Sequence, residues 1–354
     1  MPLNYLKMFS VKTKIIFGRA EEEISDLNLN LKIKGNGLLC TRRSANFKFN
    51  GLNLYHLKIS PEPCVDDIYK YFDKIRDLNF DYVLAIGGGS VLDAAKILSV
   101  MDKDRKVEGL IGMDKVKGRI KTLIAIPTTH GSGSEVTKYA VLKFQGLKQT
   151  VVSDFIVPDY ALIDENLVMN QPAELTFYTS IDAFCHNIEA YLSKVSHPLT
   201  DLNCVNGMKF FFDGIDAAME NKISGRKKML VCSVLGGIAI TNIRTNLIHA
   251  LSHVVGAEKE ISHGLANALF LRGYLKFYKG DEKFKKLGKI LNIDIIKRTD
   301  EIYEKYNTKQ LCDFAAQSEI RHIAELTYEN KRLLSIMKKE ISKEEIERIV
   351  AEAM

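Results

Sequence analysis

The segment Tyr82-Val-Leu-Ala-Ile-Gly87-Gly88-Gly89-Ser90-Val91 decides the fold of this chain. Its apolar first half indicates a buried β-strand, and a helical pattern runs from Val91 to Met101. A strand, a glycine-rich turn and a helix in direct succession are typical of the start of a parallel βαβ unit.

Outward from this segment, short apolar runs alternate with helical stretches. Strands are predicted at 37–41, 122–127 and 160–164, and a helix at 65–77. After Asp164 the strand patterns end, and apolar residues follow helical spacing at 175–193, 200–219, 227–240 and 246–255. We therefore predict a combined α/β plus all-α fold, with a doubly wound α/β domain at 1–164 and a helical domain at 165–354. The stretch from Ser342 predicts a capped surface helix.

Composition limits the classes of protein to which the chain can belong. The net charge is +6, and the basic residues form no clustered stripe of the kind that nucleic acid requires. The six cysteines form no Cys-x-x-Cys pair, which argues against a disulfide scaffold and a thiolate zinc site. No signal pattern and no apolar run of membrane-spanning length is seen. We expect a cytoplasmic protein that binds neither nucleic acid nor membrane, with a homodimer as the default assembly.

The glycines of the deciding segment favour phosphate binding. Gly87-Gly88-Gly89-Ser90 lies between a strand and a helix, where backbone N–H groups and the helix N-terminus attract an anion. A tight turn is the alternative interpretation, but three consecutive glycines exceed what a turn needs. The segment is neither Gly-x-Gly-x-x-Gly nor a Walker motif.

A second candidate loop follows the next strand, at Pro127-Thr128-Thr129-His130-Gly-Ser132-Gly-Ser-Glu135. Its hydroxyl groups and glycine-flanked turn suit the polar groups of a nucleotide. Because the carboxyl ends of parallel strands meet at one edge of a sheet, the two loops predict one nucleotide-binding crevice.

Five polar residues in the helical half have metal-ligand character. Asp182 and His186 are four residues apart, as are His249 and His253, and His263 follows. Residues at this spacing project from one face of a helix. A carboxylate with several imidazoles suits Zn²⁺ or Fe²⁺. The spacing does not determine which four of the five bind, and a helix-surface hydrogen bond is the alternative for either pair.

These segments together resemble the iron-containing (group III) alcohol dehydrogenase family. The resemblance covers about residues 13–270 and includes 87–96, 126–135, 158–164, Asp182-Ala-Phe-Cys-His186, His249-Ala-Leu-Ser-His253 and His263-Gly-Leu-Ala-Asn-Ala. It implies an N-terminal dinucleotide-binding domain, a C-terminal helical metal-binding domain, and a metal in the cleft between them. The implied reaction passes a hydride between a CH–OH substrate and NAD or NADP, with Fe²⁺ or Zn²⁺ as a Lewis acid.

The resemblance also implies roles for single residues. The implied metal ligands are Asp182, His186, His249 and His263, and His253 is implied to relay protons beside them. Cofactor contacts are implied for the first loop, namely Gly87, Gly88, Gly89 and Ser90, and for the further positions Asp93, Thr128, Thr129, Ser132 and Lys148.

The chain departs from the family pattern in ways that bear on cofactor and substrate. Arg42-Arg43 stands where many NAD-using members carry an Asp, so Arg42 favours the 2′-phosphate of NADP, with a solvated arginine pair as the alternative. Polar residues at 242–246, Arg244 among them, and His130 replace smaller or apolar ones. They predict a polar or anionic substrate, such as a sugar acid or a phosphorylated aldehyde. Alternatively, Arg244 faces away into a salt bridge.

The charged region after Gly273 is weakly similar to the family branch that acts on eight-carbon sugar acids. Two other interpretations remain open at this point. One is a polyol-phosphate dehydrogenase or cyclase of the same superfold. The other is a nucleotide-binding protein without catalytic activity.

Overall fold

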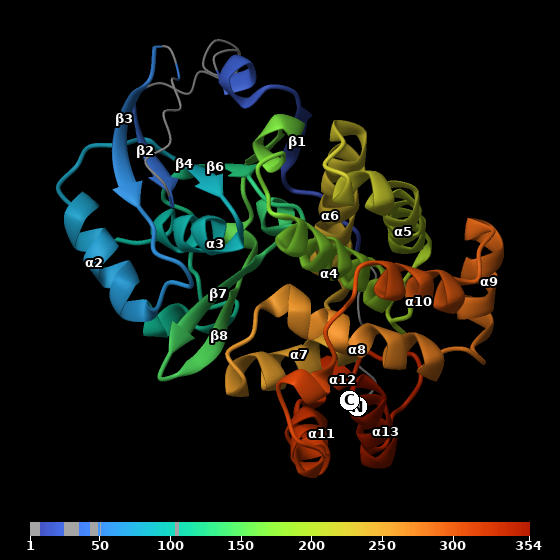
Figure 1. The fold of residues 1–354 in the computed structure, drawn as a ribbon. Helices are drawn as coiled ribbons and strands as arrows, with labels where there is room; N and C mark the ends of the chain where they lie inside the picture. The colour runs from blue at the N-terminus through green and yellow to red at the C-terminus, as the bar shows by residue number, and fades with distance from the viewer. Residues whose placement is uncertain (1–7, 25–34, 43–48, 50, 103–105) are drawn as a thin grey trace. The chain divides into compact units, whose positions relative to one another are not determined.

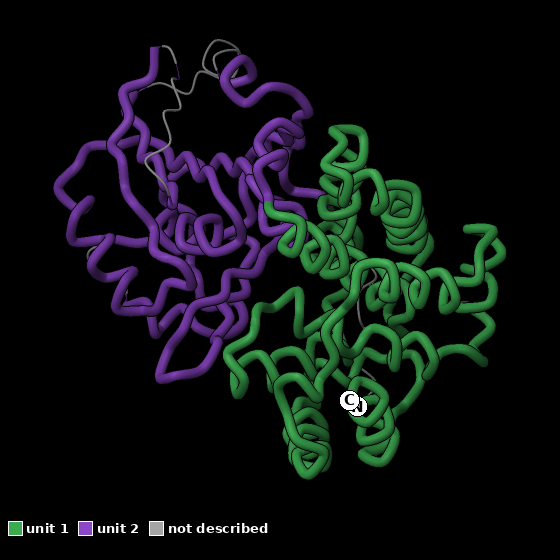
Figure 2. Tube along the Cα trace, in the orientation of Figure 1, with its two compact units in different colours: residues 1–10, 172–354 green, residues 11–171 purple. Residues whose placement is uncertain are grey.

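The computed structural model describes residues 8–24, 35–42, 49, 51–102 and 106–354, which form two compact units (Figure 2). Unit 2 comprises Val11–Gln171, and unit 1 comprises Pro172–Met354 with the described residues 8–10. The chain leaves unit 2 after Gln171 rather than after Asp164. The Asp164 carboxylate accepts hydrogen bonds from the N–H groups of Ala20 and Asn166, which keeps the following turn on unit 2.

Unit 2 is built on a six-stranded sheet in which every strand pairing is parallel (Figure 1). In order across the sheet, the strands are β1 (Lys14–Phe17), β9 (Tyr160–Ile163), β6 (Thr122–Pro127), β4 (Tyr82–Gly87), β2 (Asn36–Thr41) and β3 (Asn53–Lys58). Helices α2 (Val65–Ile75) and α3 (Gly89–Leu98) belong to the same unit. The predicted strands and helices of this half are confirmed.

Strand β4 shows why the sheet is covered on both faces. All six of its residues are buried. Val83 and Ala85 lie in the apolar core that contains α2 and α3, whereas Leu84 and Ile86 lie in a second core on the other face. Alternate side chains of a strand point to opposite faces, so an unbroken apolar run forms the central strand of a two-sided layer.

Unit 2 also contains a small second sheet that was not predicted from the sequence. It consists of β5 (Gly112–Met113), β8 (Leu147–Val152) and β7 (Tyr139–Phe144), and β7 and β8 form an antiparallel hairpin. Gln145 and Gly146 both have positive φ, at 51° and 76°. A two-residue turn with two positive φ angles matches the twist of a hairpin, and the dipeptide Gln-Gly was the signal for it.

Unit 1 is helical, with α4 at its centre. Fifteen of the nineteen residues of α4 are buried, and the helix packs against α5, α6 and α8. The helices are α4 (Ala173–Tyr191), α5 (Pro198–Met219), α6 (Ile223–Ile243), α7 (Leu247–Glu258), α8 (His263–Phe277), α9 (Glu282–Leu291), α10 (Ile295–Lys305), α11 (Ile320–Glu329), α12 (Lys331–Leu334) and α13 (Lys343–Ala353). The four long helical predictions are confirmed, as is the capped helix, because Ser342 and Glu345 form a reciprocal capping box.

Within the described ranges, no single helix has both the length and the apolar character needed to cross a membrane. Helices α6 and α7 meet these criteria only as a pair that bends by 102°.

Candidate metal centre and nucleotide loops

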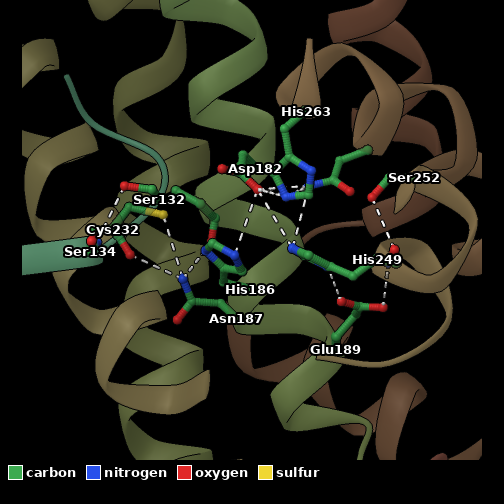
Figure 3. Close-up of polar contacts among 12 residues, drawn as sticks. Ser132, Ser134, Asp182, His186, Asn187, Glu189, Cys232, His249, Ser252 and His263 are labelled. Atoms are coloured by element: carbon green, nitrogen blue, oxygen red, sulfur yellow. Dashed lines mark hydrogen bonds and ion pairs between the residues drawn. The ribbon is translucent and has the colours of Figure 1, made fainter. Parts of the chain in front are cut away.

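Asp182 is the centre of a cluster of imidazoles in unit 1 (Figure 3). Asp182 and His186 lie one turn apart on α4, His249 lies on α7, and His263 is the first residue of α8. The Oδ1 atom of Asp182 lies 3.6 Å from the Nε2 atom of His186, 3.7 Å from that of His249 and 3.7 Å from that of His263. The helical half therefore brings the four implied ligands together.

These separations fit a coordinated metal ion better than hydrogen bonds. They exceed the 2.7–3.2 Å of ordinary N–H···O bonds. Two donors that each lie 2.0–2.1 Å from a tetrahedral Zn²⁺ are about 3.4 Å apart. The ligand atoms of Asp182, His249 and His263 all lie within 4.8 Å of one another, and the ring of His186 stacks on that of His249 with centroids 4.8 Å apart. One carboxylate oxygen and three ring nitrogens form a suitable donor set for Zn²⁺ or Fe²⁺.

The electrostatics of the cluster also favour a cation. Burial raises the pKa of Asp182, but the neighbouring imidazoles of His186, His249 and His263 outweigh it and hold the pKa well below its usual range. Burial lowers the pKa of His263 well below its ordinary value. Burial lowers the pKa of His249, but Glu189 and Asp182 outweigh it and raise the pKa to about 9, so a metal ion would have to displace a proton from this ring. The ionised carboxylate of Asp182 and the neutral imidazole of His263 are already in the protonation state that a metal requires.

Close packing of the helices makes this convergence possible. A methyl group added at Gly264 would come within 2.6 Å of the carbonyl oxygen of Tyr178. Glycine directly after His263 therefore lets the start of α8 approach α4, where Asp182 lies.

Two further buried residues contact the ligands and were missed at the sequence level. Asn267 donates a hydrogen bond from Nδ2 to Asp182 Oδ1 at 2.7 Å, and Glu189 accepts one from His249 Nδ1 at 2.5 Å. Helical spacing could have indicated both residues. Glu189 is seven residues after Asp182 and Asn267 is four residues after His263, so each lies on the same helix face as a candidate ligand.

His253 lies beside the cluster, one turn after His249 on α7. Its side chain is exposed, its ring centroid lies 5.8 Å from that of His263, and its centroid lies 6.4 Å from that of His249. It is therefore adjacent to two candidate ligands and accessible to solvent, which suits exchange of a proton.

In unit 2, the first glycine-rich loop forms a narrow cradle at the N-terminus of α3. Gly88 is the N-cap of that helix. A methyl group at Gly88 would lie 3.1 Å from Oγ1 of Thr129, and one at Gly89 would lie 3.3 Å from Oγ of Ser132. The two loops thus approach so closely that a side chain at either glycine would crowd the space between them. A bound phosphate would need that space to be free.

The second loop continues directly from β6 at the same sheet edge. Thr128 donates its N–H to the carbonyl of Gly87 at 3.0 Å, which joins the two loops. Gly131 and Gly133 have positive φ values of 151° and 61°. Ser132 Oγ accepts the N–H of Ser134, so the loop has a defined turn.

The side chain of Asp93 is engaged within unit 2. Its two carboxylate oxygens accept hydrogen bonds from the hydroxyl of Ser134 at 2.6 Å and from the N–H of Val141 at 2.9 Å. Burial raises the pKa of Asp93, and the ammonium of Lys96 opposes this rise. These contacts connect α3 to the second loop and to β7.

The other predicted cofactor residues lie at the surface of unit 2. Lys148 on β8 pairs with Glu62, with Nζ 3.3 Å from Oε1. Arg42 is exposed and directly follows β2. Because Thr41 is in register with Ile86, Arg42 stands at the same sheet edge as the glycine-rich loop. Arg43 lies outside the described residues.

The predicted substrate residues differ in environment. His130, which belongs to unit 2, is completely buried. In unit 1, Asn242 binds the backbone of Ser10 through its side-chain amide, and Asn246 caps α7. Both asparagine side chains therefore have hydrogen-bond partners within the protein and do not need a substrate to explain their polarity. The argument that residues 242–246 bind a polar substrate then depends on Arg244.

Arg244 ends α6 in a backbone conformation that is unusual for arginine. Its φ is 82° and its ψ is 166°, a region populated almost only by glycine. Its N–H donates to the carbonyl of Ile240 at 2.7 Å. The residue is partly exposed, five positions before His249.

Comparison with known proteins assigns both halves of the chain to one family. Residues 13–165 match the family model described as iron-containing alcohol dehydrogenase. Residues 176–354 match that of the C-terminal part of the Fe-containing alcohol dehydrogenase family.

Individual relatives are similar over most of the chain. The probable alcohol dehydrogenase EutG of Escherichia coli is 33% identical over 70% of this chain and 65% of its own length. The 4-hydroxybutyrate dehydrogenase of Clostridium kluyveri is 34% identical over 65% of this chain and 64% of its own length. The chain therefore spans just under two thirds of the length of these two relatives.

A solved structure extends the likeness to the whole fold. The iron-containing alcohol dehydrogenase from Thermococcus thioreducens superposes with a TM-score of 0.88 at 28% identity, covering 98% of this chain and 99% of that one. The two family models together span nearly all of the sequence, and the fold is shared with this structure. The chain therefore belongs to the iron-containing alcohol dehydrogenase family.

Proposed function

We propose that this protein catalyses reversible hydride transfer between an alcohol and NAD or NADP, with a divalent metal ion held by Asp182, His186, His249 and His263. The single observation that carries the proposal is the placement of three imidazole nitrogens 3.6–3.7 Å from one oxygen of Asp182. A nucleotide-binding protein without catalysis has no need of four convergent ligands.

The bound metal would supply Lewis acidity toward the substrate oxygen, and the nicotinamide would carry the hydride. The residues of this chain supply the rest. The N–H groups at the start of α3 bind the phosphates of the cofactor, and the hydroxyls of Thr128, Thr129 and Ser132 bind its polar groups. An imidazole nitrogen of His253 takes up the proton that the alcohol loses, and exchanges it with solvent.

For the substrate, we propose an alcohol or aldehyde that carries an anionic group, bound by Arg244. A non-glycine residue in a conformation that costs about 1–3 kcal/mol is retained where its side chain has a use. The guanidinium offers bidentate hydrogen bonds to carboxylate or phosphate. In support, one relative is named for 4-hydroxybutyrate, a hydroxy acid. Sugar acids and phosphorylated aldehydes also carry an anionic group.

A substrate panel tests this function. The purified chain is loaded with Fe²⁺ anaerobically or with Zn²⁺, and cofactor absorbance is followed with neutral alcohols, hydroxy acids, sugar acids and phosphorylated aldehydes, each with NAD(H) and NADP(H). We expect turnover, fastest at low concentrations of the anionic compounds. Metal binding without turnover of any compound would contradict the reaction, and equal kcat/KM for neutral and anionic compounds of one chain length would contradict the substrate class.

A further inference from the structure

We propose that Glu189 is a positioning residue for the metal centre, which fixes both the ring and the backbone of His249. The inference rests on the proposed function in one respect, namely that His249 is a metal ligand. Glu189 would bind neither metal nor substrate, and would act only through His249.

The contact between the two side chains is short and is buried from solvent. The Oε2 atom of Glu189 lies 2.5 Å from the Nδ1 atom of His249 (Figure 3). The side chain of Glu189 is 0% exposed and that of His249 is 4% exposed. A charge-assisted hydrogen bond between buried groups is strong and keeps the ring from rotating.

This contact determines which ring nitrogen faces the metal centre. A carboxylate can only accept, so Nδ1 of His249 carries the proton and donates to Glu189. When this ring binds a metal, its lone pair is therefore on Nε2, which is the atom 3.7 Å from Asp182 Oδ1. Metal-binding histidines generally have their other nitrogen held by a carboxylate or carbonyl in this way.

The second oxygen of Glu189 holds the backbone of the same helix. Its Oε1 atom accepts the N–H of Ile248 at 2.6 Å and lies 3.4 Å from the N–H of His249. These N–H groups lie in the first turn of α7, where they have no partner within the helix and where a negative charge is favourable. The side chain of Asn246 adds a bond to the carbonyl oxygen of Glu189 at 2.9 Å. One carboxylate therefore fixes both the position and the rotation of His249.

Glu189→Gln separates this role from a merely structural one. The amide has one accepting oxygen, so it cannot accept both from Nδ1–H and from the backbone of α7. If the oxygen stays on the backbone, the amide N–H₂ faces Nδ1 and favours the tautomer with a proton on Nε2. Metal affinity should therefore fall by about 10–100-fold, the usual effect of losing such a partner. The matched control is Glu174→Gln, the same substitution on the exposed first turn of α4, where Glu174 pairs with Lys309.

Affinity for Zn²⁺ is measured on the full chain by competition with a coloured chelator, and folding is checked by circular dichroism. Zn²⁺ affinity equal to wild type in a folded Glu189→Gln protein would overturn the inference, even if the variant melts earlier. Failure of the wild type itself to bind one Zn²⁺ per chain would instead contradict the proposed function.

A second measurement needs no substituted Glu189. In the Zn²⁺-loaded protein with ¹⁵N-labelled histidine, a long-range ¹H–¹⁵N spectrum identifies the protonated nitrogen of each ring. The resonance of His249 is assigned by its absence in His249→Gln. We expect a proton on Nδ1 of His249, and a proton on Nε2 would refute the inference.

Discussion

The Nζ atom of Lys96 lies 2.7 Å from the hydroxyl oxygen of Ser134, and both residues are buried. The same ammonium group donates to the hydroxyl of Thr137 at 3.0 Å and to the carbonyl of Tyr139 at 2.7 Å, and lies 3.8 Å from Asp93. A lysine inside unit 2 thus connects the helix that follows the first glycine-rich loop to the end of the second loop and to the residues after it.

Lys96→Met should therefore destabilise unit 2 and weaken cofactor binding. Removing one partner of a buried charge pair costs about 3–5 kcal/mol of unfolding free energy. We expect the dissociation constant for NAD(P)H to rise at least about tenfold, because the second loop loses its anchor, with Zn²⁺ binding by unit 1 unchanged. Denaturant titration and cofactor fluorescence measure the two effects. Lys70→Met is the control, since Lys70 is 71% exposed and its Nζ atom lies 3.8 Å from the nearby Asp67. Unchanged cofactor affinity in Lys96→Met would leave Lys96 with a role in folding alone.

Glu135 predicts a pH dependence of stability. Burial raises the pKa of Glu135 to about 7 from 4.5, against the opposing effect of Lys96. Between these values the folded state holds a proton that the unfolded state has lost, so Glu135 makes the folded state less stable as pH rises from about 5 to 7. Glu135→Gln removes this dependence. Its unfolding free energy relative to wild type should rise across that window and then level off. A constant difference from pH 5 to pH 8 in urea titrations would show that Glu135 ionises normally.

His263 and His253 should respond differently to the same substitution. His263 Nε2 lies 3.7 Å from Asp182 Oδ1, whereas His253 is exposed and its ring lies beside those of His249 and His263. We expect His263→Ala to lose metal, and His253→Ala to keep it and lose turnover. Metal analysis after dialysis, alongside steady-state kinetics, distinguishes the two. Equal loss of metal in both variants would place His253 among the ligands.

The features that could be predicted from the sequence are those that neighbouring residues determine. Strand β4, its glycine-rich loop and the spacing of Asp182 and His186 are local patterns of this kind. The burial of Lys96 could not be predicted from the sequence, because its hydrogen-bond partners are 38–43 residues away in the chain and are brought close by tertiary packing. The left-handed φ of Arg244 was also hidden, since nothing in the adjacent residues requires it.

Arg42 tests the cofactor preference. It is exposed and stands where β2 ends, at the sheet edge that carries both nucleotide loops. If it binds a 2′-phosphate, the wild type should bind NADPH more tightly than NADH, and Arg42→Asp should reverse that order, because a carboxylate accepts from a 2′-hydroxyl and repels a phosphate. Fluorescence titrations with both cofactors measure this. The matched control is Arg76→Asp, on the exposed C-terminus of α2. An unchanged preference in Arg42→Asp would leave that side chain as surface charge.

Arg244→Gly should make the protein more stable and the enzyme less selective. The φ of 82° and ψ of 166° at Arg244 cost about 1–3 kcal/mol in any residue but glycine, partly offset by the roughly 0.5–1 kcal/mol that glycine loses in chain entropy. A charged hydrogen bond to substrate is worth about 1.5–3 kcal/mol, so the KM for an anionic alcohol should rise at least about tenfold. Neutral alcohols should be nearly unaffected. Asn292→Gly is the control, because Asn292 also has a positive φ, of 54°, at the end of α9. It should change neither KM. A more stable Arg244→Gly enzyme with an unchanged KM for anionic substrates would show that the arginine, despite its strained backbone, does not recognise the substrate.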